Sequence, residues 1–534
     1  MIHTKFYKRI AAPASGKSYG AVQYIINNIK HKSKRYVVCA ISQDLCKDLK
    51  ESIISQYPDV KIDLIISDTT PTRMRVQDKY KDYIQNSDSD VIVITHTTLL
   101  NSYGSVDATG WDIIIDELPH IVQMKAIKGT LKNDNISQWL DYKYPNDNSH
   151  YKEMVIRTGW EDTIKRELEA FDDISKGETF MSESAIHGLQ GLLTGDTTIL
   201  RREYIDKEDG LTKICYYFSQ VYNPYILCKG FGEAIILCAD FEKQLTGLVF
   251  KHKFNIVVEE KEEIQLRATS YKDPHRIKIY PLIMPPVNFT KYISGQYMDK
   301  RSGVKYPAKI YDNLVEVFEH LVDVAENIVG DNGYIYTVNK FRGEQVDKGD
   351  YPFLSERDSV KRLKYNPHGL NRFVDYNIAL GLFHCNVSPQ QEVLLKHLAE
   401  SCGQEAEVFL KGYETSASND PLFQLITRTS IRNYEDLQEV ICIVPDHRVV
   451  KYLTDGWFKG AEVIYDHAVV LHQGTKTNSR PKKFQGLFEM NDSEAAKYNR
   501  WVKSMGLSPK EMSTVDNKHI EMVTNWITEL RGEE

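Results

Sequence analysis

The chain has 534 residues, and its hydrophobic (42%) and charged (26%) fractions are ordinary for a globular protein. This composition excludes disorder as the main state. The 67 Lys and Arg against 74 Asp and Glu residues give a net charge of −7, which argues against a generally basic nucleic-acid coat but allows a local basic groove. No apolar stretch approaches the ~20 residues that would span a membrane. We therefore expect a soluble, intracellular, cytoplasmic protein of two or three domains.

The eight cysteines form no C-x-x-C pair, which argues against a zinc site. Several lie inside apolar runs such as RYVVCAI and EVICIVP. We expect them to be small buried side chains in a reducing compartment. The first residues, MIHTKFYKRIAAP, contain no apolar signal core.

The first 120 residues alternate short strands with helices. Apolar runs predict the strands, and a period of 3.6 residues predicts the helices. Strands are expected at Phe6–Ile10, Tyr36–Ile41, Val91–Thr95 and Ile113–Ile115, and helices at Lys17–Asn28 and Gln43–Ser55. Near-continuous apolar strands that alternate with helices are typical of a parallel sheet covered on both faces.

From about residue 121 this rhythm breaks. A polar stretch, KYPNDNSHYK, precedes a charged helix around Glu161–Ala170. A hairpin follows, TTILRREYID-KEDG-LTKICYYF, in which Asp209-Gly210 supplies the turn. The buried-strand pattern returns at Ala234–Ala239. We interpret about 121–230 as an insertion in a first domain that spans 1–245.

A second α/β series begins near Ala308, after a Pro-containing linker with the sequence DPHRIKIYPLIMPPVNF. An amphipathic helix at Ile310–Val329 is stopped by Gly330. Further elements are strands at Tyr334–Val338, Ala379–Cys385 and Val440–Val444 and a helix at Gln390–Ser401. We assign 246–456 to a second domain. The tail, 457–534, is predicted to be a mostly helical extension.

The strongest motif is AAPASGKS, residues 11–18, between a strand and an amphipathic helix. This context is the one that a phosphate-binding P-loop requires. Backbone N–H groups at Ala14, Ser15 and Gly16 and at the helix start are expected to cradle phosphates. Lys17 is expected to reach the terminal phosphates, and the hydroxyl of Ser18 to hold Mg²⁺.

A second motif, WDIIIDELPH, delivers two carboxylates to the end of a buried strand. Asp116 can hold the metal ion, directly or through water, and Glu117 can polarise the water that attacks a γ-phosphate. An apolar run that ends in Asp-Glu is often only a strand that reaches solvent. The pairing with GKS one α/β unit earlier favours the catalytic interpretation.

These residues resemble motifs I and II of superfamily 2 helicases, the DEAD/DEAH-related group. That family often writes motif I as A-x-x-G-x-G-K-T/S, so an alanine at position 11 is expected, whereas Ala14 replaces the middle glycine. DELPH resembles the D-E-x-H pattern with one extra residue before His120. The compact chain, which starts directly at the first strand, would suit a phage-encoded enzyme.

Other segments resemble the remaining motifs in the family's order. VVCAISQDLCKDL resembles motif Ia, and VIVITHTTLL resembles a T-H-x-x-L stretch. The resemblance implies that Ser42, Gln43, Thr95 and His96 contact the backbone of a nucleic acid. Taken singly, each of these stretches is also what a buried strand running into a loop looks like.

The second half carries the remaining similarities. AIILCAD, residues 234–240, resembles motif III; Tyr334–Asn339 resembles motif IV; and residues 368–377 resemble motif V. The run QLITRTSIR, residues 424–432, resembles motif VI, with a threonine at 427 in place of glycine. The resemblance implies roles for Gln424, Arg428 and Arg432, of which Arg428 is the better candidate for an arginine finger.

The resemblance implies two tandem RecA-like P-loop domains that bind ATP and Mg²⁺ between them. Lys17, Asp116 and Glu117 would contact the triphosphate from one domain, and Arg428 from the other. Closure on ATP and opening after hydrolysis would move the protein along a strand. The basic stretch 476–484 could extend the nucleic-acid track, although such a charge run is usually a solvated loop.

Three functions remain open at this point. The first is an ATP-dependent helicase or translocase that acts on nucleic acid. DNA is favoured as its substrate, as a single strand or a junction. Its role would lie in replication, recombination or repair, with proteins of those processes as possible partners. The second is a DNA-packaging ATPase of the terminase type, which would need a C-terminal nuclease with clustered acids. The third is a nucleic-acid-binding scaffold that keeps the fold but has lost hydrolysis.

Overall fold

The computed structural model describes residues 4–31, 34–72, 74–130, 137–144, 150–166, 183–205, 210–268, 271, 273–301, 303–306, 309, 313–349, 351, 354, 359–364, 373–433, 436–472, 497–498, 500–502, 523 and 525–527. The chain divides into two compact units. Unit 1 comprises Met1–Lys272, Asn366–Val374 and Cys385–Asp436; unit 2 comprises Asp273–Tyr365, Asp375–His384 and Leu437–Glu534. These bounds differ from the boundary predicted after residue 245, because residues up to 272 and the segment 385–436 pack with the first sheet.

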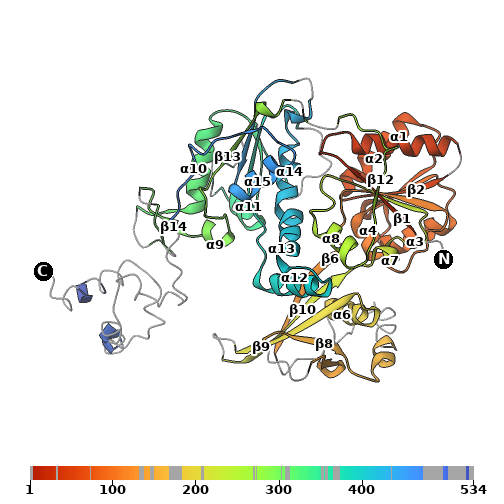
Figure 1. Cartoon of the computed structure of the whole chain (residues 1–534), viewed down its shortest axis with the longest axis horizontal. Helices are drawn as coiled ribbons and strands as arrows, with labels where there is room; N and C mark the ends of the chain where they lie inside the picture. Colours follow the sequence, from red (N-terminus) through yellow and green to blue (C-terminus); the bar gives the residue numbers. More distant parts are fainter. Residues whose placement is uncertain are drawn as a thin grey trace. The chain divides into compact units, whose positions relative to one another are not determined.

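Unit 1 is built on a seven-stranded sheet whose described strands are all parallel (Figure 1). In spatial order they are β12 (Glu259–Glu260), β1 (Lys5–Ile10), β11 (Glu233–Cys238), β5 (Trp111–Asp116), β2 (Arg35–Ala40), β4 (Val91–Thr95) and β3 (Ile62–Ile65). Because side chains alternate along a strand, Ile113 and Ile115 enter one hydrophobic core while Ile114 enters the core on the other face. The apolar strands are therefore buried on both faces, as predicted.

Helices of unit 1 supply the rest of these two cores. One face is covered by α1 (Lys17–Lys30) and α2 (Gln43–Gln56). The other carries α3 (Val76–Asn86), α4 (His96–Asn101), α8 (Leu245–His252), α12 (Pro389–Ser401) and α13 (Ala406–Glu414). Further short helices are α7 (Pro224–Leu227) and α14 (Asp420–Ile426).

The insertion forms its own five-stranded antiparallel sheet. Its order is β6 (Val122–Thr130), β10 (Thr212–Val221), β9 (Thr197–Ile205), β8 (Lys152–Ile156) and β7 (Leu140–Tyr142), with α6 (Glu183–Thr194) packed on it. The predicted β9–β10 hairpin is present, with Ile205 opposite Thr212. The expected turn residue Asp209 lies outside the described residues.

Unit 2 holds a second parallel sheet of six strands. Its order is β18 (Val360–Arg362), β17 (Tyr334–Val338), β19 (Ile378–Leu382), β20 (Val440–Val444), β13 (Ile277–Pro281) and β21 (Glu462–Val463). The helices of this unit include α9 (Lys291–Ser294), α10 (Val317–Val329), α11 (Lys340–Asp347) and α15 (His447–Asp455). A small antiparallel sheet joins β15 (Lys305–Tyr306), β14 (Tyr297–Met298) and β16 (Val315–Glu316).

The predicted fold class is confirmed: two parallel α/β sheets, like tandem RecA domains, with an antiparallel insertion. Three details were wrong. The Pro-containing linker contains β13, which lies inside the second sheet between β20 and β21. Helix α10 begins at Val317, because Val315–Glu316 pairs with β14.

The third detail is the start of the tail. Residues 457–472 contain β21 and no helix, whereas the few described residues beyond 496 are helical, and the rings of Trp501 and Trp526 stack there with centroids 5.1 Å apart.

Tyr103 links the first sheet to the insertion. Its hydroxyl donates to Oδ2 of Asp196 over 2.8 Å and accepts from the backbone N–H of Asn223 over 3.1 Å. Tyr103→Phe leaves both partners unpaired, so we expect a loss of about 1–3 kcal/mol in the free energy of unfolding, measured by urea titration. Tyr83→Phe on α3 is the control. Equal midpoints for the two variants would contradict this assignment.

Candidate functional site

The loop between β1 and α1 has the backbone of an anion-binding turn. Ala14 and Gly16 adopt the left-handed conformation, with φ of 68° and 88°. This costs little at a glycine but strains an alanine, so the loop holds Ala14 in a conformation that side chains disfavour. The ammonium of the buried Lys17 donates to the carbonyl oxygens of Ala11 (2.6 Å) and Ala12 (3.1 Å). The loop and its lysine therefore form one pre-arranged positive concavity at the start of α1.

A segment that the sequence analysis missed holds this loop from outside. The backbone N–H groups of Arg267 and Ala268 both donate to the carbonyl oxygen of Ser15, at 2.8 and 3.2 Å. The hydroxyl of Tyr271 donates to the carbonyl oxygen of Pro13 over 2.7 Å. We call residues 264–268 together with Tyr271 the strap. It matches no motif, because it acts on the loop mainly through its backbone.

Two acidic residues end β5 beside the loop. The hydroxyl of Ser18 lies 3.2 Å from each carboxylate oxygen of Asp116. Glu117 follows with a φ of 67°, and its N–H donates to the carbonyl oxygen of Leu237 on β11 over 2.8 Å. A left-handed glutamate is a strained residue that its surroundings impose, and such strain concentrates at functional sites.

The predicted motif VI residues reach the same place from a distant part of the chain. Gln424, near the end of α14, donates from Nε2 to Oε1 of Glu117 over 3.1 Å. Nη2 of Arg428 donates to Oε1 of Gln424 over 2.9 Å. Gln424 and Arg428 are almost fully buried, and Nε of Arg432 donates to the carbonyl oxygen of Thr427. The amide of Gln424 thus bridges the acid and the guanidinium.

Burial governs the electrostatics of these acids. It raises the pKa of Asp116 to about 7, and the neighbouring Glu117 adds to the rise. Burial also raises the pKa of Glu117, against the pull of Lys17 and Gln424. Asp420, at the start of α14, has a pKa well above its ordinary range because it is buried near Glu117 and Asp240. Burial therefore favours the neutral forms of these acids, and a cation bound beside them would favour their ionised forms.

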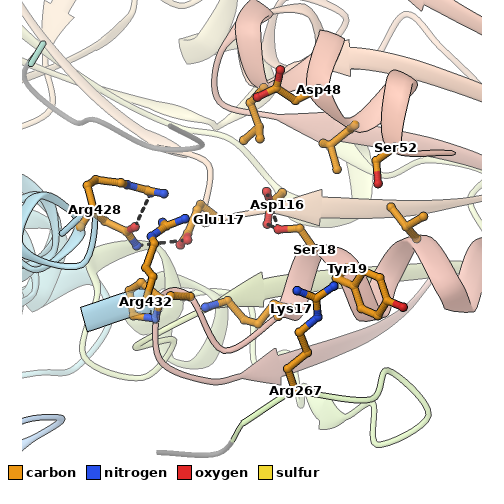
Figure 2. A pocket seen from close by; sticks show the side chains of 17 residues that line it. Lys17, Ser18, Tyr19, Asp48, Ser52, Asp116, Glu117, Arg267, Arg428 and Arg432 are labelled. Atoms are coloured by element: carbon orange, nitrogen blue, oxygen red, sulfur yellow. Dashed lines mark hydrogen bonds between the residues drawn. The ribbon is translucent and has the colours of Figure 1, made fainter. Parts of the chain in front are cut away.

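These residues line one cavity of about 400 Å³, all of it within unit 1 (Figure 2). One wall is the loop with Lys17 and Ser18, the second is the end of β5 with Asp116 and Glu117, and the third is the segment that carries Gln424, Arg428 and Arg432. Figure 2 shows Arg428 and Arg432 on the side of Glu117, and Arg267 below Ser18. Every one of the six residues assigned to catalysis lines this cavity, together with Ala14, Gly16 and Ser18.

A second cavity of about 360 Å³ gathers three of the four residues expected to touch nucleic acid. Ser42, Gln43 and Thr95 line it where β2 and β4 end, and its described lining is uncharged. It is completed by Ile41, Ser67, Val76, Gln77, Thr97, Thr98 and Asn101. Ser42 and Thr95 also cap the helices that follow, by accepting from the N–H groups of Leu45 and Thr98.

The fourth residue points elsewhere. His96 is buried, and its Nε2 lies 3.0 Å from the carbonyl oxygen of Asp116. The expected contact of this side chain with nucleic acid does not fit that position, because Thr95 ends β4 and the first helical residue turns inward. His96 instead connects the end of β4 to the end of β5.

The segments that resemble motifs III, IV and V lie partly within the described residues. β11 ends at Cys238, and Asp240 follows as a nearly buried carboxylate beside Asp420 and Glu117. The motif IV stretch is strand β17. Of motif V, residues 368–371 lie outside the described residues, as does the basic stretch 476–484.

The described residues include a pair suited to a metal ion and no membrane-spanning helix. Among the described residues, no group of three or more His, Cys, Asp or Glu side chains gathers as a metal site. The pair Ser18 and Asp116 fits a hard cation that takes few protein oxygens and completes its shell from water and phosphate, as Mg²⁺ does. None of the described helices is both long and apolar enough to cross a bilayer.

Comparison with known proteins finds similarity only among solved structures. No protein-family model and no curated protein matches the chain. Dbp5 of S. cerevisiae bound to RNA and ADP BeF3 aligns at 10% identity and a TM-score of 0.35, covering 87% of this chain and 85% of that one. The yeast DEAD-box splicing factor Prp28 aligns at 9% and 0.20 (88% and 81%), and the DEAD-box helicase Mss116 bound to ssRNA and UDP-BeF at 10% and 0.27 (96% and 81%). The likeness to DEAD-box helicases is one of fold, and it is loose.

His96 gives this region a pH dependence. Burial lowers its pKa from 6.5 to about 3, so between these pH values the unfolded chain binds a proton that the folded chain does not. The contribution of neutral His96 to the free energy of unfolding is complete above pH 6.5 and is lost as the pH falls toward 3. We expect His96→Gln, whose amide can still reach the Asp116 carbonyl, to flatten the acid limb of the urea-unfolding midpoint plotted against pH. Parallel profiles for the two proteins would rule this out.

Proposed function

We propose that the protein hydrolyses ATP with Mg²⁺ and couples hydrolysis to binding and movement on nucleic acid, as a helicase or translocase. One observation carries the proposal: Lys17, the acids Asp116 and Glu117, and Arg428 line one cavity, where Gln424 bridges acid and arginine. These are the charges that phosphoryl transfer needs, a cation for the phosphates, an acid for the water and a guanidinium for the developing charge.

The roles follow from the chemistry of each side chain. Lys17 and the loop N–H groups hold the phosphates. Glu117 orients the attacking water and accepts its proton; its raised pKa reflects the burial that makes it a stronger base. Arg428 stabilises charge on the transferred phosphoryl group, and Arg432 reinforces it. When bound at Ser18 and Asp116, Mg²⁺ supplies charge neutralisation of the phosphate oxygens.

Nucleic acid is proposed to bind at the second cavity through Ser42, Gln43 and Thr95. Uncharged hydroxyl and amide groups suit hydrogen bonds to phosphate and sugar, which position a strand without reading its bases. This mode needs little positive charge and is compatible with a net charge of −7. We propose DNA, as a single strand or junction, as the substrate, with a role in replication, recombination or repair.

The catalytic assignment predicts large rate losses. Lys17→Ala and Glu117→Gln should lower phosphate release from ATP by about 10²-fold or more, and Arg428→Ala by about 10³-fold. Lys30→Ala, at the exposed end of the same helix α1, is the matched control and should keep wild-type turnover. Equal phosphate release from wild type and these variants would reject the motor and favour a scaffold that has lost hydrolysis.

The nucleic-acid assignment predicts weaker stimulation. Gln43→Ala should raise the DNA concentration for half-maximal ATPase stimulation by roughly fivefold, the effect of one lost hydrogen bond. Ser55→Ala, exposed on the same helix α2, is the control. Measurement with single-stranded DNA and RNA, and strand displacement from 3′- and 5′-tailed duplexes, would test the preference for DNA. Stimulation by RNA alone would contradict that preference.

A further inference from the structure

The cavity continues beyond the part that the triphosphate chemistry uses. Past Ser18 it runs between α1 and α2, where Val22, Leu45 and Leu49 form an apolar floor. Asp48 and Ser52 on α2 provide polar groups across the cavity from Arg267 (Figure 2). An apolar floor with a few polar groups at its edge is typical of a site for a small organic ligand.

The opposite wall is a stacked pair. The guanidinium of Arg267 lies 3.8 Å from the centroid of the Tyr19 ring. The strap fixes the base of this side chain, because the N–H of Arg267 is bonded to Ser15. Gly16 permits the approach: a Cβ at position 16 would lie 2.8 Å from Cγ of Arg267. The backbone thus brings a planar cation to the end of the loop where a bound triphosphate would join its nucleoside.

We propose that this extension, between Tyr19, Arg267 and α2, binds the nucleoside half of a nucleoside triphosphate, with the base stacked on the guanidinium of Arg267. The inference rests on the proposed function and adds the nucleoside subsite to it. Asp48 and Ser52 accept hydrogen bonds from the sugar hydroxyls. Every base has a π-face, so stacking binds purines with little discrimination between adenine and guanine.

In this arrangement the residue that sets nucleotide affinity is distinct from the residues that act in hydrolysis. Arg267 touches the base, whereas Lys17, Glu117 and Arg428 act on the phosphates. Loss of the stack should therefore change KM and leave kcat nearly constant. A charged but non-planar lysine at 267 should not replace arginine, since stacking needs the planar group.

The test compares three substances: ATP, GTP, and inorganic tripolyphosphate as a competitive inhibitor that lacks a nucleoside. We expect similar KM values for ATP and GTP in the wild type. Arg267→Ala and Arg267→Lys should both raise these values about tenfold, with kcat within about twofold and the tripolyphosphate inhibition constant unchanged. Glu262→Ala, exposed just before the strap, is the matched control.

Three outcomes would overturn the inference alone. Restoration of the wild-type KM by Arg267→Lys would assign Arg267 to a phosphate. An equal loss of tripolyphosphate affinity in Arg267→Ala would show that the strap only supports the loop. An unchanged KM in Arg267→Ala would remove the subsite while the proposed function stands. A wild-type protein that binds neither ATP nor tripolyphosphate would instead overturn the proposed function and the subsite together.

Discussion

The hydrogen bond from Gln424 to Glu117 joins two residues that lie 307 positions apart in the chain. It brings the end of α14 to the end of β5, and Arg428 follows because it is bonded to the same amide. The bridge joins the guanidinium of Arg428 to the carboxylate of Glu117 beside the loop. One neutral amide thus accepts from arginine and donates to glutamate at the centre of the candidate site.

The amide of Gln424 lies among several buried carboxyl groups. Asp116, Glu117, Asp240 and Asp420 lie around Lys17, and burial raises the pKa of three of them. Buried carboxylates of like charge are unfavourable together, and the strained φ of Glu117 adds to the cost. Such a site is poorly arranged for stability alone. A bound cation would offset part of this cost, as the proposed function requires.

Much of this arrangement could be predicted from the sequence. The apolar run before Asp116 and the GKS loop define strand ends, and parallel strands bring their carboxyl ends to one edge of the sheet. The strap could not be predicted, because its hydrogen bonds come from backbone groups that any residue carries. Strand β13 was missed because prolines flank an apolar run that reads as a linker. The direction of His96 depends on Thr95 capping α4, a local geometry that the T-H-x-x-L pattern does not specify.

The segment that carries Gln424 and Arg428 has a double attachment. By its packing it belongs to unit 1, where α13 contacts α8 and the hydroxyl of Ser416 accepts from the N–H of Leu245 over 3.0 Å. By its connections it is the crossover between β19 and β20, two neighbouring strands of the sheet in unit 2. A ligand in the cavity that displaces Arg428 would act on this crossover. The two ends of the crossover lead into β19 and β20 of the second sheet. In a P-loop motor this crossover would be one covalent connection from the cavity to the second sheet, and the strap, which leads into β13, would be another. Loss of the Glu117–Gln424 hydrogen bond would then affect the coupling between the cavity and the second sheet, as well as the hydrolysis step.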